Sequence, residues 1–424
     1  MKTIVTALLL AAAAPSVAAP VDLVTLYKDL HAHPELAFHE VRSAGILAAE
    51  ARAAGWEVTE KVGRTGVVAV LKNGKGPTVL IRADMDGLPV PEATGLPYAS
   101  QATGHYDGGP ETPVMHACGH DIHMSVWVGT ARWLAENRKR WRGTVVMVGQ
   151  PAEEAGGGAK AMLADNFYAR FPRPDFAIAL HDDTRMPAGQ VSVPPLRALS
   201  IISTMDIIVR GVGGHGAYPA TTKDPVALTG RIITALQTIV ARENDPFQPA
   251  VVTVGSVHGG TKHNIIPDEV ALQLTIRSYD PAQQQKLIDA IKRIATGEAI
   301  AAGMPDDRMP IFKGGEFGPP TLNDAPLAAR LKAQFEAKLG KDRIVERDPS
   351  MASEDFQYFG LEAKVPSVIW WLGGVPKAQW EAAKAGQGRV PSLHNSGWAP
   401  DPAPTIATGV ESMAAAVELL LPAK

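Results

Sequence analysis

Cysteine is almost absent from this chain, because Cys118 is the only one among its 424 residues. A single cysteine has no partner for an intramolecular disulfide, which excludes a disulfide-stapled scaffold. An excess of one charge is also lacking: 41 lysines and arginines stand against 44 aspartates and glutamates, for a net charge of −3. Because no basic run with interleaved aromatic residues occurs either, this balance argues against a surface that binds nucleic acid.

Long hydrophobic runs are missing beyond the N-terminus, where no segment approaches the ~20 apolar residues that span a bilayer. The N-terminus itself combines Lys2, an apolar stretch over 4–14 and a small-residue end over 15–20, which is typical of a secretory signal peptide. A retained anchor helix is disfavoured because the apolar stretch is too short. We therefore expect residues 1–19 to be a signal peptide, cleaved after Ala18 or Ala19. The product would be periplasmic or secreted, without membrane association after cleavage.

The chain is long enough for two domains, and 46% of its residues are hydrophobic. Up to about residue 195, helical segments alternate with β-rich runs, which predicts an α/β domain with a mainly parallel sheet flanked by helices. From Leu199 the pattern changes to strands and helices of an α+β type, over 200–210, 225–242, 251–258, 269–278 and 281–302. We predict a first domain of residues 20–196 and 310–424, with a second domain of residues 197–309 inserted into it.

The segment from His116 to His123 places three histidines, one aspartate and the only cysteine within eight positions. A thiolate two residues before an imidazole, with Gly119 between them to allow a tight bend, is typical of one half of a transition-metal site. The alternative is a buried apolar cysteine beside surface histidines. In an exported protein, a lone cysteine fits better as a metal-bound thiolate than as an exposed free thiol.

Two adjacent carboxylates, Glu153 and Glu154, follow a β-branched run at 144–149 that predicts a buried strand. The carboxyl ends of strands are where open α/β sheets place their chemistry. Neighbouring carboxylates often divide the work, with one binding metal while the other stays free as a general base. Taken alone, the pair would be interpreted as the N-cap and first turn of the next helix.

Other strand ends and one loop carry similar side chains. A predicted apolar strand ends in His181, and an earlier one leads to Asp84 and Asp86. These two aspartates are alternate residues of an extended segment and therefore face the same side. A loop near the C-terminus supplies His394. A histidine at a strand end is often only structural, but its placement here repeats that of the glutamate pair and favours a metal ligand.

Together these motifs resemble the amidohydrolase branch of the metal-dependent aminoacylase and carboxypeptidase superfamily. That branch includes hippurate hydrolases and the hydrolases of indoleacetate–amino acid conjugates. The resemblance spans nearly the whole chain after residue 19 and keeps the family's motif order: Arg82 to Pro89, His116 to His123, Gln150 to Glu154, His181, Gly213 to Pro219, Asn264 to Pro267, Ser353 to Phe356 and His394. It implies a catalytic domain with an inserted ferredoxin-like lid domain, through which two subunits form a homodimer.

The resemblance also implies two divalent metal ions per subunit, with five residues as their ligands. Cys118 would bridge the ions, His120 and His181 would bind one of them, and Glu154 and His394 would bind the other. Mixed sulfur, nitrogen and oxygen ligands suit zinc, and also manganese, nickel or cobalt.

Catalytic and substrate-binding roles follow from the same resemblance. Glu153 matches the general base that deprotonates a water, Asp86 matches the carboxylate that orients a ligand, and His215 matches a histidine that reaches the site from the partner subunit's lid. From composition alone, His215 is a turn histidine held between glycines. Asn264 and Arg277 resemble positions that hold the substrate's carboxylate, although Arg277 is equally well explained as half of a surface ion pair.

We therefore predict a metal-dependent hydrolase that cleaves the amide bond of N-acyl amino acids or short peptide-like amides. A carboxypeptidase or dipeptidase on the same scaffold is one alternative, disfavoured because the cysteine motif replaces the histidine-based motif of those enzymes. A non-catalytic exported solute-binding protein is the alternative from another class, and such a protein has no use for the pair of Glu153 and Glu154.

Overall fold

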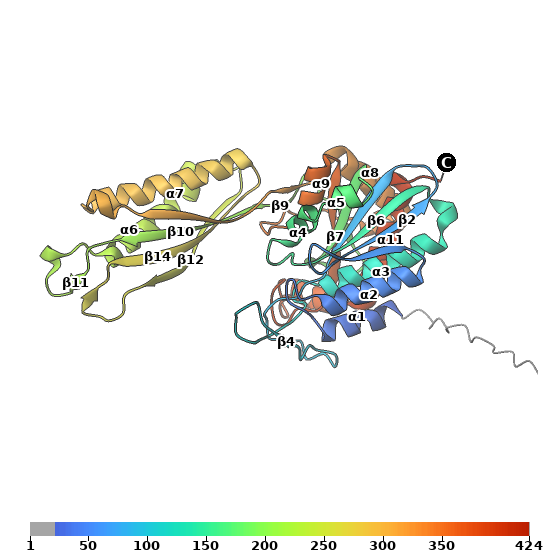
Figure 1. Ribbon diagram of the computed structural model, residues 1–424, viewed down its shortest axis with the longest axis horizontal. Helices are drawn as coiled ribbons and strands as arrows, with labels where there is room; N and C mark the ends of the chain where they lie inside the picture. Colours follow the sequence, from blue (N-terminus) through green and yellow to red (C-terminus); the bar gives the residue numbers. More distant parts are fainter. Residues whose placement is uncertain (1–21, 424) are drawn as a thin grey trace, which may run out of the picture.

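The computed structural model describes residues 22–423, so the predicted signal peptide at residues 1–19 lies outside the described residues. Two lobes follow one another along the long axis of the molecule (Figure 1). The larger lobe contains a seven-stranded sheet and the smaller one a four-stranded sheet. Within residues 22–423, no helix has both the length and the apolar character needed to cross a membrane.

The larger sheet has the strand order β1-β2-β6-β3-β7-β17-β8. Its four central strands are parallel, whereas the pairs toward both edges are antiparallel. The carboxyl ends of the parallel strands therefore meet at one edge of the sheet. The bounds are β1 (Glu57–Val62), β2 (Gly66–Asn73), β3 (Thr78–Asp84), β6 (Gly143–Gln150), β7 (Phe176–Pro187), β8 (Val191–Ser192) and β17 (Ser367–Val375).

Helices cover both faces of this sheet, because successive residues of a strand point to opposite sides. On β3, Ile81 packs in a core cluster with five helices, whereas its neighbour Leu80 packs on the other face with three shorter ones. The first group is α1 (Leu23–Ala32), α2 (Val41–Ala53), α3 (His120–Glu136), α8 (Ala325–Leu339) and α11 (Pro402–Leu420). The second group is α4 (Gly158–Ala164), α5 (Phe167–Arg170) and α9 (Gln357–Ala363). The predicted α/β architecture is confirmed.

The smaller lobe is an antiparallel sheet of order β12-β14-β10-β15, with α6 and α7 packed on one face. Along the chain its elements run β10, α6, β12, β14, α7, β15, which is the expected ferredoxin-like order. Both helices begin at an Asp–Pro pair, where Asp224 and Asp280 accept hydrogen bonds from first-turn N–H groups. The bounds are β10 (Ile201–Arg210), α6 (Pro225–Thr238), β12 (Ala250–Gly259), β14 (Glu269–Ser278), α7 (Pro281–Ala301) and β15 (Ile311–Gly318).

The smaller sheet extends beyond residue 309, where the sequence predicts the inserted domain to end. Strand β15 pairs with β10 from Ile311 opposite Ile208 to Gly318 opposite Ile202. The pairing contains a register shift, and a Cβ on Gly315 would lie 2.1 Å from the Thr204 hydroxyl. Glycine thus leaves room for the Thr204 side chain at a bulge of the sheet.

Candidate metal centre

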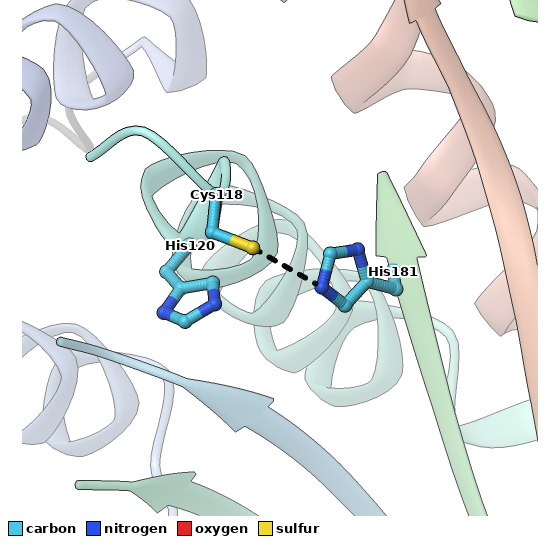
Figure 2. Close-up of side chains that lie close together, drawn as sticks. All are labelled: Cys118, His120 and His181. Atoms are coloured by element: carbon cyan, nitrogen blue, oxygen red, sulfur yellow. Dashed lines mark hydrogen bonds between the residues drawn. The ribbon is translucent and has the colours of Figure 1, made fainter. Parts of the chain in front are cut away.

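The turn before α3 brings Cys118 and His120 next to His181 of β7. Gly119 makes this turn with a φ of +75°, and a Cβ there would lie 2.4 Å from the carboxyl group of Asp182. Glycine is therefore required both by the backbone angle and by the space. Figure 2 shows Cys118 with its sulfur directed at His181, and His120 beside it.

The potential ligand atoms form two groups that share Cys118. Atoms of Cys118, His120 and His181 lie within 4.8 Å of one another, and so do atoms of Cys118, Glu154 and His394. The Cys118 Sγ is 3.6 Å from His181 Nε2 and 3.2 Å from His394 Nε2. The His394 Nε2 is 3.3 Å from Glu154 Oε1. The structure thus brings all five predicted ligands together, and their individual roles as ligands stay a prediction.

The sequence predicts His181 at the end of a strand, but the residue lies inside one, because β7 continues to Pro187. The pairing of β3 with β7 stops at Arg82 opposite Ala179, so β7 leaves its neighbour just before His181. The Nδ1 of His181 lies 2.8 Å from the carbonyl of Asp182, to which it donates, and its Nε2 faces Cys118. A hydrogen bond of this kind fixes the ring orientation of a metal-binding histidine.

The surroundings of His120 and Glu154 indicate whether the cluster fits a metal ion. His120 Nδ1 lies 2.8 Å from the carbonyl oxygen of Asp86, to which it donates, so its Nε2 is the nitrogen left to bind an ion. This Nε2 and the Oε1 of Glu154 are buried and form no hydrogen bond among the described residues, and the only cationic neighbours of that Oε1 among them are the His120 and His394 imidazoles. Buried polar atoms without a partner are unfavourable, and a cation between them, in place of the Nε2 proton, would satisfy both. Sulfur, imidazole and carboxylate ligands suit a transition metal, so the residues present fit such an ion.

The electrostatics of the cluster also favour a cation. Burial raises the pKa of the Cys118 thiol well above its usual range, and the Glu154 and Asp182 carboxylates raise it further. Burial lowers the pKa of the His120 imidazole, but Asp84 and Asp86 outweigh burial and leave that pKa well above normal. The protein alone therefore holds protons on both groups, and a bound cation would replace them.

Glu153 and Glu154 lie in a turn between β6 and α4, so the interpretation of the pair as part of a helix is wrong. Asp86 holds this turn, since its carboxylate accepts the N–H of Glu153 at 3.1 Å and that of Glu154 at 3.0 Å. Potential ligand atoms of both glutamates and His120 lie within 4.8 Å of one another, which places Glu153 at the border of the cluster. Burial raises the pKa of Glu153 well above its usual range, and Glu354 and Glu154 add to the shift.

A buried arginine cluster near Glu153 was missed by the sequence analysis. Arg82 donates to Asp84 and to Glu354 at 2.6 Å each, and to Asp355 at 3.1 Å. Burial lowers the pKa of Arg82, but these three carboxylates outweigh burial and the net shift is upward. A charged residue in the apolar strand β3 was a signal for such a cluster. Two of its partners, Glu354 and Asp355, could not be identified from it, because they lie in the distant Ser353 to Phe356 motif.

The three predicted residues of the smaller lobe differ in their positions. Arg277 lines the cavity of about 670 Å³ that contains the cluster, and its Nη1 donates to Ser353 Oγ at 3.2 Å. His215 lies in β11 (Gly214–His215), at the end of the smaller lobe that points away from the larger one (Figure 1). Asn264 lies beside it, with its carbonyl accepting the Gly216 N–H at 2.9 Å. The structure does not bring His215 or Asn264 to the cluster of their own chain.

The larger lobe is an α/β domain with a cluster of cysteine, histidine and carboxylate side chains, and a ferredoxin-like domain is inserted into its sequence. This combination is typical of a two-domain, metal-dependent hydrolase. Comparison with known families agrees with this class. The chain belongs to peptidase family M20/M25/M40, whose family model matches residues 80–384.

Individual relatives are similar over most of their length. N-acetylcysteine deacetylase of Bacillus subtilis is 32% identical over 366 residues, which cover 84% of this chain and 90% of that protein. Hippurate hydrolase of Campylobacter jejuni is 36% identical over 341 residues, which cover 78% and 83%. The crystal structure of a dinuclear metal-binding peptidase of the M20 family from Bacillus subtilis is similar with a TM-score of 0.75 at 28% identity, covering 94% of this chain and 97% of that one. The predicted family and the hydrolase class are confirmed, and the solute-binding alternative is disfavoured.

Proposed function

We propose that this protein hydrolyses the amide bond of N-acyl amino acids at a centre of two divalent cations. The observation that carries the proposal is the pair of ligand groups that share Cys118, with Glu153 at their border. The names of two relatives, a deacetylase of N-acetylcysteine and a hippurate hydrolase, support this class of substrate.

The reaction divides between the cations and the side chains of the protein. When bound, divalent cations at such a centre polarise a carbonyl group and lower the pKa of water. Glu153 accepts a proton from the water while the oxygen of the water forms a bond to the carbonyl carbon. Glu153 then delivers the proton to the amine nitrogen as the carbon–nitrogen bond breaks, which yields a carboxylic acid and a free amino acid. The carboxylate of Asp86 accepts the backbone N–H of Glu153 and thereby holds the turn that carries this residue.

Arg277 is the proposed binding residue for the α-carboxylate of the substrate. A guanidinium group can form two parallel hydrogen bonds to one carboxylate. The position of Arg277 at the cavity, where it contacts Ser353 of the larger lobe, supports this role. The cavity volume of about 670 Å³ is in the range of small-molecule sites.

The proposal includes a homodimer and export from the cell. His215 and Asn264 lie far from the cluster of their own chain, so a partner subunit is needed to place them at a site. Strand β12 is an edge of the smaller sheet, and an edge strand has free backbone groups that can pair with another chain. Export rests on the signal-peptide pattern of residues 1–19 alone.

A carboxypeptidase remains a second candidate, because one relative favours it. Thermostable carboxypeptidase 1 of Saccharolobus solfataricus is 33% identical over 355 residues, which cover 83% of this chain and 85% of that protein. The two functions differ in the acyl group, on the carbonyl side of the amide bond that is cleaved. An amidohydrolase of the proposed kind cleaves N-acetyl and N-benzoyl amino acids, whereas a carboxypeptidase prefers peptides.

The deciding experiment measures metal content and hydrolysis on the same purified protein. We expect two divalent ions per subunit by elemental analysis, and hydrolysis of N-acetyl and N-benzoyl amino acids that exceeds hydrolysis of the matching dipeptides. A chelator should abolish the activity, and the divalent metal should restore it. A fully metal-loaded protein that cleaves dipeptides but no N-acyl amino acid would favour the carboxypeptidase, and one that cleaves neither would contradict both.

A further inference from the structure

The cavity wall beyond His181 carries an arginine that the proposed reaction does not use. Arg347 is almost completely buried, with 5% of its side chain exposed. Its guanidinium group lies over the ring of Trp371, with Cζ 3.6 Å from the ring centroid. Trp371 packs in turn against His181, at 5.6 Å between ring centroids. The Trp371 ring is therefore in contact with both Arg347 and a predicted metal ligand.

Arg347 and Trp371 have hydrogen-bond donors without acceptors. The Nη1 of Arg347 and the Nε1 of Trp371 are buried and have no partner among residues 22–423. Asp183 forms an ion pair with the Nε of Arg347, so the edge made by the two Nη atoms remains for another group. Both side chains line the cavity that holds the cluster. Since buried donors without acceptors are unfavourable, an anion in the cavity would suit this wall.

The charge of this wall points in the same direction. Arg185, Arg277 and Arg347 all line the cavity. Asp183 pairs with both Arg347 and Arg185, and Glu316 lies near Arg277. Three guanidinium groups thus face two carboxylates on the wall. The other acids of the cavity belong to the metal cluster or to the arginine cluster around Arg82.

We propose that Arg347, held flat on Trp371, binds a second carboxylate of the substrate, so that the enzyme prefers diacidic N-acyl amino acids. This inference rests on the proposed function and adds a substrate class to it. Stacking on an indole ring fixes the plane of the guanidinium, and its free edge then receives one carboxylate through two parallel hydrogen bonds. Arg277 is left for the α-carboxylate. The second carboxylate belongs either to an acidic amino-acid side chain or to a dicarboxylic acyl group.

Two pairs of substrates of equal shape separate these sources. N-acetylglutamate is compared with N-acetylglutamine, and N-succinylalanine with the derivative whose free succinyl carboxylate is an amide. We expect wild type to favour the acid of at least one pair by about 10- to 100-fold in kcat/KM, as for a buried hydrogen bond to a charge. In Arg347→Met this ratio should fall to near one. Arg347→Lys should keep part of it, because lysine keeps the charge but loses the planar fork.

Arg185→Gln is the matched control, because Arg185 contacts the same Asp183 but is 45% exposed. An exposed pair contributes little, so the ratio should change only slightly in this variant. A ratio near one for both pairs in wild type would overturn the inference. An equal loss of kcat/KM for the acid and the amide in Arg347→Met would also overturn it, since a guanidinium that only packs on Trp371 has that effect.

Binding without turnover keeps the two proposals distinguishable. Calorimetry measures the affinities of N-acetylglutamate and N-acetylglutamine for metal-loaded Glu153→Gln protein. The ratio of these two affinities is then compared between this protein and the same protein with Arg347→Met. If wild type hydrolyses no N-acyl amino acid, yet Arg347 still confers tighter binding of the acid, then the proposed function fails and the inference stands. Equal affinities for the acid and the amide would sink the inference even if hydrolysis is observed.

Discussion

Glu153 and Glu154 are identical side chains in adjacent positions, yet their surroundings differ. Glu154 Oε1 lies 3.3 Å from His394 Nε2, within the group around Cys118. Glu153 lies at the border, where burial and the nearby Glu354 raise its pKa. The backbone N–H groups of both bind the same carboxylate of Asp86, so one turn places Glu154 within the ligand group and Glu153 at its border.

This difference predicts opposite results for two equivalent substitutions. Glu153→Gln should lower kcat by at least about 100-fold, because a general base is lost, while metal content stays near that of wild type. Glu154→Gln should lower the metal content itself, since it removes a charged oxygen next to His394. Elemental analysis and steady-state kinetics on both variants check this. Loss of metal in Glu153→Gln, or full activity in that variant, would contradict the assignment of the base.

His31 is a buried histidine between two carboxylates, away from the cavity. Its Nδ1 lies 2.6 Å from Asp121 Oδ2, and its Nε2 lies 3.0 Å from Glu92 Oε1. Burial lowers the pKa of the imidazole, but the two carboxylates outweigh burial and raise the pKa from 6.5 to about 9. Because the folded protein binds this proton more tightly than the unfolded chain, the stabilisation is complete below pH 6.5 and is lost as the pH rises through about 9.

His31→Gln should therefore lower the free energy of unfolding more at about pH 6 than at about pH 10, by up to about 3 kcal/mol. Urea unfolding of wild type and variant at both pH values measures the difference. His33→Gln is the matched control, because His33 follows the same helix and has 56% of its side chain exposed. A loss of stability that is equal at both pH values would show that the His31 proton does not stabilise the fold.

At the scale of single elements, the turn at Gly119 fixes the start of α3 and with it Cys118 and His120. Gly119→Ala should destabilise the protein by more than about 1–2 kcal/mol, because it adds a steric clash with Asp182 to the cost of a positive φ. Its metal affinity should fall as well. Gly45→Ala in α2 is the matched control: a Cβ there has nothing within 4 Å, and alanine should stabilise the helix by about 0.5–1 kcal/mol. Thermal unfolding and metal titration compare the two, and an undisturbed Gly119→Ala protein would contradict this account of the turn.

Most elements were predictable from the sequence, because their patterns are local. The apolar runs of β6 and β17 and the Asp–Pro starts of α6 and α7 each indicate an element within a few residues of its bounds. Strand β15 was not recognised, since its glycines serve a bulge that depends on β10. The five predicted ligands were identified through motif resemblance. The position of Arg347 on Trp371 was not predictable, because it depends on a contact between distant segments.

At the scale of the whole molecule, some predicted site residues lie in the larger lobe and others at the far end of the smaller lobe. The cluster lies in the larger lobe, whereas His215 and Asn264 lie at the far end of the smaller one (Figure 1). A symmetric dimer is the simplest assembly that lets the smaller lobe of each subunit complete the site of the other. In such a dimer, the residues of one active site come from two polypeptides.

Mixed dimers test this arrangement, because two inactive variants can then restore one intact site. Glu153→Gln and His215→Ala should each be nearly inactive alone. When the two are coexpressed, half of the dimers are mixed and each has one site with both native residues, so activity should return to about a quarter of wild type. Glu153→Gln coexpressed with Cys118→Ser is the control: both changes affect the larger lobe, so no dimer of these chains has an intact site and activity should stay absent. A monomer by sedimentation, or full activity of His215→Ala alone, would contradict the shared site, because a histidine that never reaches the cluster of another subunit cannot be needed there.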